Sequence, residues 1–307
     1  MISAVVDEAR RQLGDLVATR RKAPSAGGRQ FVVGLLGRGI QASKTPRMHE
    51  LEGRRIGFDY TYVLIDFDTL GLADHDLGAM IELAEALGFA GLNVTHPFKQ
   101  AVLPLLDDLA PEAAAIGAVN TVVFGTGRRL GHNTDSWGFA ESFREGLAGA
   151  SMEAIVQFGA GGAGAAVGHA LLSLGGRKLT LCETELDRAK RLAERLGERF
   201  GAEVEVTDDP AIGLAGATGV VNTTPVGMAK YPGLAFPGEL LRASHWVAEI
   251  IYFPADTALL QAARRLGCRT LGGTGMAVYQ AVKAFELFTG TAPDRAAMLA
   301  HFEAESR

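Results

Sequence analysis

Residues Ala154–Gly164 read Ala-Ile-Val-Gln-Phe-Gly-Ala-Gly-Gly-Ala-Gly, and this stretch decides the fold. It begins with a short apolar run of the length expected for a buried β-strand. The glycine-rich part that follows leads into Ala163–Leu174, whose pattern predicts a helix, and Lys178–Cys182 then predicts a second strand. A strand, a tight loop, a helix and another strand together predict one βαβ unit with parallel strands.

The loop of this unit has the G-x-G-x-x-G spacing, in the residues Gly159, Ala160, Gly161, Gly162, Ala163 and Gly164. The first glycine permits the tight turn, the second lets backbone approach a pyrophosphate, and the third lets the helix pack closely on the strand. The helix N-terminus adds N–H donors for the phosphates. A structural glycine-rich turn is the alternative, but the complete strand-loop-helix-strand context favours a dinucleotide. The sequence therefore predicts a Rossmann-like domain.

Glu183 ends the second strand of this unit, 183 − 159 = 24 positions after the first glycine. A carboxylate there can accept hydrogen bonds from the adenosine ribose hydroxyls and would repel a 2′-phosphate. The residue therefore favours NAD over NADP. The alternative is that Glu183 only begins the following helix, where an acidic side chain suits the helix dipole.

Further strands and helices alternate on both sides of this unit. Strands are predicted at Phe31–Leu36, Tyr60–Ile65, Ala90–Val94, Val119–Phe124, Arg129–His132, Gly219–Asn222 and Trp246–Ile251, with helices at Pro46–Ile56, Leu77–Leu87, Asp135–Leu147, Glu185–Phe200, Met276–Phe288 and Arg295–Glu303. Two consecutive series of this kind predict a two-domain α/β protein. We expect an N-terminal α/β domain over residues 1–134, completed by C-terminal helices within 272–307. The doubly wound, Rossmann-like domain is expected over residues 135–271.

The composition is that of an ordinary globular chain. Of its 307 residues, 48% are hydrophobic and 21% are charged. The formal net charge of −5 argues against nucleic acid or an anionic membrane as the main partner, and no apolar run reaches membrane-spanning length. Cys182 and Cys268 lie in apolar surroundings without metal-ligand spacing, so we expect buried thiols, no metal and a cytoplasmic location. Monomer and homodimer both remain open.

Polar side chains gather in short segments of the N-terminal half, mostly where predicted strands end. The segments are Ser43-Lys-Thr45, Asn93-Val-Thr95-His-Pro-Phe-Lys99, Asn120-Thr121 and Asn133-Thr-Asp135. Polar residues at the ends of neighbouring strands are typical of a site for a small ligand.

Six segments, in order, resemble the shikimate/quinate dehydrogenase family, and the resemblance runs from about Val33 to the final helices. The matching segments are Asn93–Lys99, Gly117–Thr121, Asn133–Gly138, Asn222–Met228, Tyr252–Thr257 and Met276–Gln280. Six matches in the same order are highly specific. The resemblance implies a substrate-binding N-terminal domain and oxidation of a ring hydroxyl of a small polyhydroxy carboxylic acid, quinate or shikimate or both.

The resemblance also implies that Lys99 and Asp135 are the catalytic pair. Their chemistry suits the reaction, because a proton must leave the alcohol oxygen as hydride leaves the carbon. An ammonium beside a carboxylate can shuttle that proton and stabilise the developing alkoxide. A salt bridge across the domain junction is the structural alternative.

Other roles follow from the resemblance alone. Ser43 and Thr45 would hold the substrate carboxylate, and Asn93, Thr95, Asn120, Tyr252 and Gln280 would hold ring hydroxyls or the carboxylate. Cofactor contacts would come from Thr223, Pro225 and Gly275 in addition to the glycine-rich loop and Glu183. Structural alternatives exist for single members of this set: Thr45 and Thr95 could cap helices, Asn120 could satisfy a turn, and Gln280 could face solvent.

Three departures from the family pattern point to its NAD-linked quinate/shikimate branch. Ala42 stands where the family often has histidine, Thr45 replaces a serine, and Glu183 stands where NADP-using members commonly carry an arginine. The alternatives are an NADP-linked shikimate or aminoshikimate dehydrogenase, or a nucleotide-binding regulator that lacks catalysis. Presence of both Lys99 and Asp135 argues against the regulator.

Overall fold

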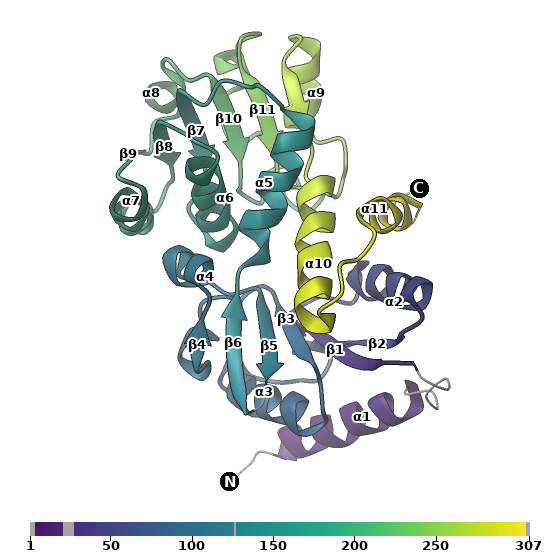
Figure 1. The fold of residues 1–307 in the computed structure, drawn as a ribbon. Helices are drawn as coiled ribbons and strands as arrows, with labels where there is room; N and C mark the ends of the chain where they lie inside the picture. Colours follow the sequence, from purple (N-terminus) through teal and green to yellow (C-terminus); the bar gives the residue numbers. More distant parts are fainter. Residues whose placement is uncertain (1–3, 21–27, 126, 305–307) are drawn as a thin grey trace. The chain divides into compact units, whose positions relative to one another are not determined.

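The structure, a computed structural model, describes residues 4–20, 28–125 and 127–304 (Figure 1). The chain divides into two compact units. Unit 1 spans residues 1–134 and 281–307, and unit 2 spans residues 135–280. The chain therefore enters unit 2 at Asp135 and leaves it after Gln280, inside a helix, whereas the sequence analysis placed the second boundary after residue 271. Which unit binds which ligand stays a prediction at this point.

Unit 1 is built on one mixed sheet, with the strand order β2-β1-β3-β5-β6-β4. Its strands are β1 (Gln30–Gly37), β2 (Asp59–Asp66), β3 (Gly91–Val94), β4 (Asp108–Leu109), β5 (Thr121–Gly125) and β6 (Arg128–His132). The first three strands are parallel, as their separation by helices predicts. Strand β5 is antiparallel to both of its neighbours, β3 and β6.

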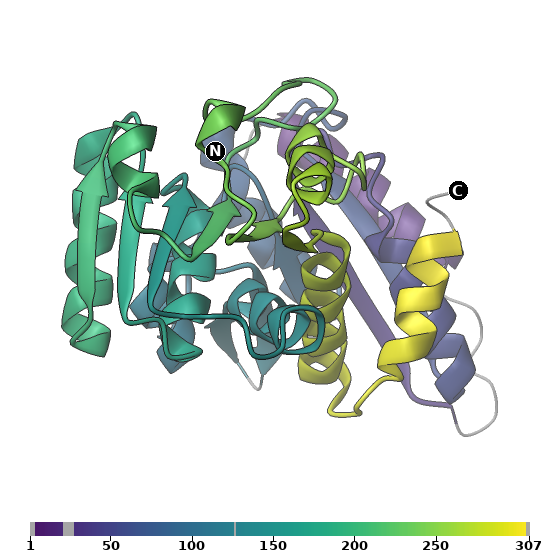
Figure 2. The same cartoon turned by 90° about the horizontal axis from the view of Figure 1, so that it is seen from above.

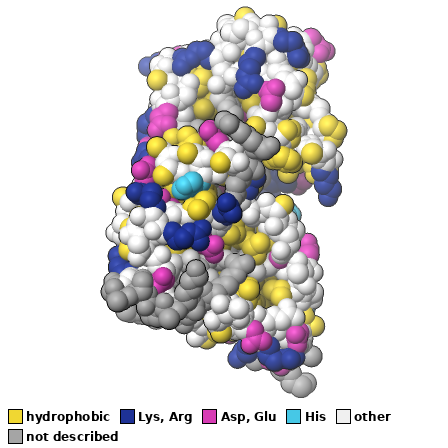
Figure 3. Space-filling view, turned by 90° about the vertical axis from the view of Figure 1, so that its right-hand side faces the viewer, with side chains coloured by type: hydrophobic (Ala, Val, Ile, Leu, Met, Phe, Trp, Pro, Cys, Tyr) yellow, Lys and Arg dark blue, Asp and Glu magenta, His cyan; other side chains and the backbone are white. Residues whose placement is uncertain are grey.

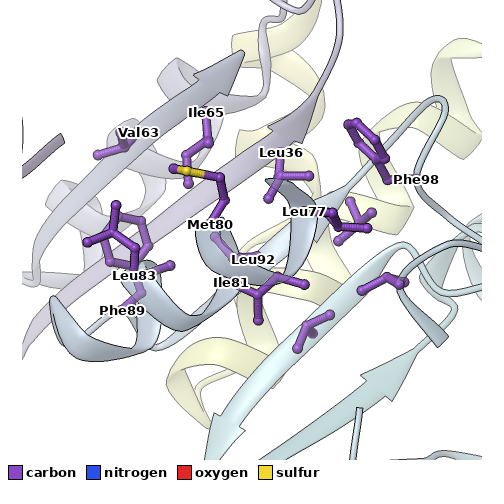
Figure 4. Close-up of a cluster of buried hydrophobic side chains, with 14 of the residues drawn as sticks. Leu36, Val63, Ile65, Leu77, Met80, Ile81, Leu83, Phe89, Leu92 and Phe98 are labelled. Atoms are coloured by element: carbon purple, nitrogen blue, oxygen red, sulfur yellow. The ribbon is translucent and has the colours of Figure 1, made fainter. Parts of the chain in front are cut away.

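The helices of unit 1 cover this sheet. They are α1 (Ala4–Arg20), α2 (Thr45–Ile56), α3 (Leu77–Ala86), α4 (Pro111–Ile116) and α11 (Arg295–Ala304), with 3₁₀ turns η1 (Asp74–Asp76) and η2 (Leu103–Leu105). Figure 4 shows the apolar side of α3 against the sheet, with Leu77, Met80, Ile81 and Leu83 beside Leu36, Val63, Ile65 and Leu92. Helix α11 lies beside α2 (Figures 1 and 2).

Unit 2 is built on a fully parallel sheet with the strand order β12-β11-β10-β7-β8-β9. Its strands are β7 (Ala154–Phe158), β8 (Lys178–Cys182), β9 (Glu203–Thr207), β10 (Gly219–Asn222), β11 (Trp246–Glu249) and β12 (Arg269–Leu271). In chain order, β8 and β9 are added on one side of β7. Strands β10, β11 and β12 are then added on its other side. Ligands of such sheets bind at the carboxyl ends of the strands where this order reverses, here β7 and β10.

The helices that belong wholly or partly to unit 2 connect these strands. They are α5 (Thr134–Gly146), α6 (Gly162–Ser173), α7 (Leu186–Phe200), α8 (Pro210–Leu214), α9 (Ala258–Arg265), α10 (Thr274–Thr289) and the 3₁₀ turn η3 (Gly238–Leu240). Phe158 of β7 stacks on Phe236 with ring centroids 4.4 Å apart in the core of this unit. Cys182 and Cys268 are buried free thiols, as predicted, and burial raises the pKa of Cys182 to about 11.

No described helix is long and apolar enough to cross a bilayer. Figure 3 shows one face of the molecule, on which Lys and Arg side chains are dispersed and Asp and Glu side chains lie among them. An interspersed pattern of this kind lacks the single-sign field of a basic nucleic-acid surface.

Candidate active site

The ends of β3, β5 and β6 bring together three polar segments of unit 1, those that contain Asn93, Asn120 and Asn133. The ladder pairs Asn93 at the end of β3 with Thr121 at the start of β5, and Thr121 with His132 at the end of β6. The turn after β3 carries Lys99, which is half-buried and whose backbone oxygen accepts a hydrogen bond from Val119 N at 2.8 Å. This bond fixes the Lys99 turn to the segment that leads into β5.

Thr95 lies at the start of the same turn, which contains no α-helix for it to cap. Its backbone N–H donates to Leu36 O at 3.0 Å. A Cβ added to Gly37 would lie 2.4 Å from the Thr95 methyl group, so only glycine leaves room for Thr95 beside the end of β1. Thr95 is therefore held in place by the adjacent parallel strand.

Asn120 organises the chain immediately before Asp135. Its Oδ1 accepts from the backbone N–H of Thr134 at 2.8 Å, and its Nδ2 donates to Thr134 Oγ1 at 2.9 Å. Asn133 Nδ2 donates to Ala118 O at 2.9 Å. Asp135 itself is buried, 6% exposed, in the first turn of α5, where the helix dipole favours an anion.

Asn93 is buried within a hydrogen-bonded set that the sequence analysis did not anticipate. Its Oδ1 accepts from the Tyr62 hydroxyl at 2.8 Å, and its Nδ2 donates to Thr121 Oγ1 at 3.0 Å. Burial raises the pKa of Tyr62 well above its usual value, so this hydroxyl remains a donor at physiological pH. The amides of Asn93 and Asn120 thus already have protein partners, and direct contact with a substrate stays a proposal for both.

Ser43 and Thr45 lie where the loop after β1 enters α2. Ser43 Oγ accepts from the backbone N–H of Thr45 at 3.3 Å, which leaves the Ser43 hydroxyl hydrogen available to donate. The residue at the N-cap of α2 is Lys44, and it makes no side-chain capping bond. Thr45 is the first helical residue and half-buried, so the alternative that it caps this helix was wrong.

The glycine-rich loop of unit 2 has the geometry that its spacing predicts. Gly159 has φ +98°, and a Cβ on it would lie 2.8 Å from Thr223 Oγ1. A Cβ on Gly164 would lie 2.5 Å from Gly159 O, whereas one on Gly161 would meet open space. Helix α6 begins at Gly162, so its free N–H groups, including that of Ala163, adjoin the open side of the loop. The loop can receive a pyrophosphate there.

Two side chains support this loop through hydrogen bonds to its backbone oxygens. Gln157, fully buried on β7, donates through Nε2 to Gly159 O at 2.8 Å and to Gly164 O at 2.9 Å. Thr223 Oγ1 donates to Phe158 O at 2.7 Å and to Gly159 O at 3.0 Å. Sequence reasoning missed Gln157, although a polar residue inside an apolar strand just before the glycines was a visible signal. Thr223 supports the cofactor loop, and Pro225 lies exposed two residues further on.

Glu183 lies beside the loop and is 8% exposed. Its Oε2 accepts from Ala160 N and from the Arg188 guanidinium, both at 2.9 Å, and its Oε1 accepts from Thr184 Oγ1 at 3.1 Å. Burial pushes the pKa of Glu183 upward, but the bonds from Ala160, Arg188 and the Glu185 N–H outweigh it and hold the pKa below its usual value. Glu183 is thus an ionised group at the loop.

A further buried carboxylate, missed in the sequence, lies at the end of β11. Glu249 is 1% exposed and accepts from Asn222 Nδ2 at 3.1 Å through each of its two oxygens. Tyr252, on the segment that follows, is 46% exposed. An acidic residue that ends an otherwise apolar strand was the available signal.

Gly275 and Gln280 lie on α10, which packs on α5 within unit 2. A Cβ on Gly275 would lie 2.1 Å from Ser142 Oγ, and one on Gly138 would lie 2.6 Å from Gln280 N. Both glycines are therefore needed for close helix contact. The Gln280 amide donates to Ala277 O of its own helix at 2.9 Å. A cofactor contact at Gly275 and a substrate contact at Gln280 remain proposals.

Two histidines of unit 1, His132 and His49, have structural partners. His132 Nδ1 lies 3.2 Å from Glu112 Oε1. His49 is fully buried, its Nδ1 lies 3.1 Å from the Tyr60 hydroxyl, and burial lowers its pKa to about 3. No group of three or more His, Cys, Asp or Glu among the described residues could hold a metal ion.

Family models match two parts of the chain. Residues 35–122 match the shikimate dehydrogenase substrate binding domain, and residues 273–301 match the shikimate 5′-dehydrogenase C-terminal domain. The chain is 52% identical to the shikimate dehydrogenase (NADP(+)) of Streptomyces avermitilis. The 273 aligned residues cover 88% of this chain and 94% of that protein. The chain is 48% identical over 271 residues to the quinate/shikimate dehydrogenase (NAD(+)) of Corynebacterium glutamicum, covering 86% and 95%.

The solved structures agree in fold. The quinate dehydrogenase from Corynebacterium glutamicum in complex with NAD has a TM-score of 0.86 and 45% identity, covering 90% of this chain and 100% of that chain. The relatives are thus divided between NAD and NADP forms.

Proposed function

Because the chain belongs to the shikimate dehydrogenase family, we propose that it is an NAD-dependent quinate/shikimate dehydrogenase. It oxidises a ring hydroxyl of quinate, shikimate or both, giving 3-dehydroquinate and 3-dehydroshikimate. That it is an oxidoreductase using a nicotinamide dinucleotide follows from the family; the cofactor and the acid are our proposal.

The polar residues assigned above handle the substrate and its proton. When bound, the nicotinamide supplies the acceptor for hydride from the alcohol carbon. Lys99 and Asp135 act on the hydroxyl proton, with the ammonium stabilising the alkoxide as the proton departs. Ser43 and Thr45 donate hydroxyl hydrogens to the carboxylate of the acid, and Asn93, Thr95, Asn120, Tyr252 and Gln280 orient the ring.

One observation carries the assignment of the catalytic pair. Val119 N donates to Lys99 O, and the next residue, Asn120, holds Thr134 through both its backbone N–H and its hydroxyl. The turn that bears Lys99 and the residue that precedes Asp135 are therefore fixed to the same two-residue segment. A constellation for proton transfer needs such support, because misplacement by about 1 Å can cost a hundredfold in rate.

The preference for NAD is supported by Glu183. Its ionised carboxylate is held at the glycine-rich loop, where it can accept the ribose hydroxyls and would repel a 2′-phosphate. Arg188 is the observation that favours the NADP alternative, because its guanidinium could pair with a phosphate if it left Glu183. While Arg188 Nη2 donates to Glu183, that donor is not available to a 2′-phosphate.

The test is the rate of reduced-nicotinamide formation with NAD and each acid in Lys99→Ala. We expect kcat to fall at least about a hundredfold, the usual scale for loss of a proton-transfer group. The affinity for NAD alone should change little, because Lys99 lies in unit 1. Asp135→Asn should behave similarly, and the double variant should be far from additive.

Lys178→Ala is the matched control, because Lys178 pairs with Glu203 and Glu205 at the outer strands of the Rossmann-like sheet. It should retain normal kcat. A Lys99→Ala variant with near-normal kcat would remove Lys99 from the mechanism, and dinucleotide binding without turnover in the unmodified protein would favour the regulator.

A further inference from the structure

Glu249 is a buried charged group that the proposed mechanism does not use. In the β10–β11 ladder it stands opposite Asn222, and both residues end their strands. Each is 1% exposed. A carboxylate removed from water is costly unless it is hydrogen-bonded, so its partners indicate why the fold accepts it here.

The partners come from three different elements. Asn222 Nδ2 at the end of β10 donates to both oxygens at 3.1 Å, and Ile251 N after β11 donates to Oε1 at 3.1 Å. Thr257 Oγ1 donates to Oε2 at 3.3 Å, and the same hydroxyl oxygen caps α9 by accepting from Leu260 N at 3.3 Å. Glu249 therefore joins the ends of two strands and the start of a helix.

These partners lie on the two segments that carry predicted ligand contacts. Asn222 Nδ2 also donates to Val226 O at 2.9 Å, which folds the segment containing Thr223 and Pro225 back toward the strand end. Gly227 has φ +119°, and a Cβ on it would lie 3.5 Å from Glu249 Oε2. The segment after β11 carries Tyr252.

We propose that ionised Glu249 is a positioning residue that holds the segments after β10 and β11 in the arrangement that receives the dinucleotide. This inference rests on the proposed function, because it takes the segment after β10, with Thr223 and Pro225, to contact the cofactor. The pattern of partners supplies the reason. The Asn222 Nδ2 group and the Ile251 N–H can only donate, so a protonated Glu249 carboxyl would lose acceptor capacity where the fold supplies donors.

The charge of Glu249 changes within an accessible pH range. Burial raises its pKa to about 7, while the hydrogen bonds from Asn222, Ile251, Thr257 and the Ile250 backbone act in the opposite direction. All the groups that hold the pKa of Glu249 down are neutral. They come from β10, from the segment after β11 and from the start of α9. Glu249 should therefore be mostly ionised at about pH 8 and mostly protonated at about pH 6.

The experiment measures the Kd of the full-length protein for NAD by calorimetry between about pH 6 and pH 8 in the unmodified protein and in Glu249→Gln. The unmodified protein should bind NAD about fivefold more weakly at about pH 6 than at about pH 8. A fivefold change in Kd is smaller than the change expected from complete loss of one hydrogen bond to a charged group. Glu249→Gln should bind about tenfold more weakly at pH 8 and show a flat profile. Glu249→Asp keeps a carboxylate and should restore a pH dependence.

The matched control is Glu205→Gln on β9, whose carboxylate pairs with Lys178 on the sheet surface. It should leave both Kd and its pH profile unchanged. If Glu249→Gln lowers Tm but retains the normal Kd and slope in its folded fraction, the role is structural and the inference is overturned.

If Glu249→Gln does not fold, Thr257→Val replaces it, because loss of one donor should move the midpoint of the profile to higher pH. An unchanged midpoint overturns the inference. Absence of NAD and NADP binding in the unmodified protein would instead contradict the proposed function, on which the inference depends.

Discussion

At the scale of single residues, some residues that are predicted to contact a ligand also hold nearby chain segments in place. Asn120 is predicted to contact substrate, yet its amide also fixes Thr134, directly before Asp135. Thr223 is predicted to contact cofactor, yet its hydroxyl supports Gly159. Substitution of such residues would mix a change in binding with a change in local structure, so a residue without a visible structural bond gives a cleaner test.

Thr45 is such a residue. Its side chain does not cap α2, because the N-cap is Lys44 and makes no side-chain capping bond. Thr45→Ala should therefore leave Tm nearly unchanged while it raises KM for both quinate and shikimate about tenfold, since a hydrogen bond to a charged group contributes about 1.5–3 kcal/mol. Steady-state kinetics and a melting curve on this one variant give both quantities.

Thr45→Ser is the matched control and should mainly change the ratio of KM values for the two acids, because it keeps the hydroxyl and removes the methyl group. A lower Tm with unchanged KM in Thr45→Ala would contradict binding of the carboxylate by Thr45.

At the scale of elements, glycines decide how closely helices and strands approach. Gly138 and Gly275 let α5 and α10 pack within unit 2, and Gly164 lets α6 start against the glycine-rich loop. This explains why the G-x-G-x-x-G spacing predicted its local geometry well: Gly159 and Gly164 each meet a short-range steric demand, and a Cβ on Gly161 would meet open space. The partner helix of Gly275 lies far away in sequence, which no local pattern reveals.

Gly275→Ala should lower the free energy of unfolding by about 1–3 kcal/mol, because its Cβ would lie 2.1 Å from Ser142 Oγ and 2.9 Å from Ser142 Cβ. The control is Gly197→Ala in α7, where the added Cβ would make only an ordinary 3.7 Å contact with Ala202 O. It should stabilise the helix by up to about 1 kcal/mol. Denaturant unfolding of both variants checks the pair; equal effects would contradict this packing.

At the scale of the whole molecule, the sequence predicted most elements, including the four-residue strands β3 and β10, but missed others, among them β9 and α9. The βαβ unit from Ala154 to Cys182 was predicted closely, since its strands and helix have clear periodicity. The edge strand β12 is only three residues long and was missed. The predicted strand Trp246–Ile251 ends earlier, at Glu249, because the Ile251 N–H turns to the Glu249 carboxylate.

The site was predictable to a similar extent. Resemblance to a family identified candidate residues such as Lys99, and the position after the glycine-rich loop identified Glu183. The supporting residues Gln157, Tyr62 and Glu249 were missed, because their role depends on which strands adjoin, and that becomes visible only in the fold.

Stability should depend on pH with two opposing contributions. Glu183 and Asp66 have lowered pKa values, so their stabilisation is present above the unfolded pKa and is lost as pH falls through the folded value. Glu249 has a raised pKa, from 4.5 to about 7, so the folded state holds its proton more tightly and stability falls as pH rises from about 4.5 to 7.

The contribution of Glu249 can be isolated as a difference. As pH falls from about 8 to 5, the unfolding free energy of the unmodified protein should rise relative to that of Glu249→Gln, by on the order of 3 kcal/mol at most. Urea unfolding of both proteins across this range measures it. A difference that is independent of pH would contradict the raised pKa.

The central claim, an NAD-linked dehydrogenase of quinate and shikimate, is tested most directly by initial rates with quinate and shikimate, each with NAD and NADP, in all four combinations. The account predicts turnover of at least one acid with NAD, and kcat/KM at least about a hundredfold higher for NAD than for NADP, because the ionised Glu183 carboxylate, proposed to accept the adenosine ribose hydroxyls, would repel a 2′-phosphate. Equal kcat/KM for the two cofactors, or a preference for NADP, would contradict it.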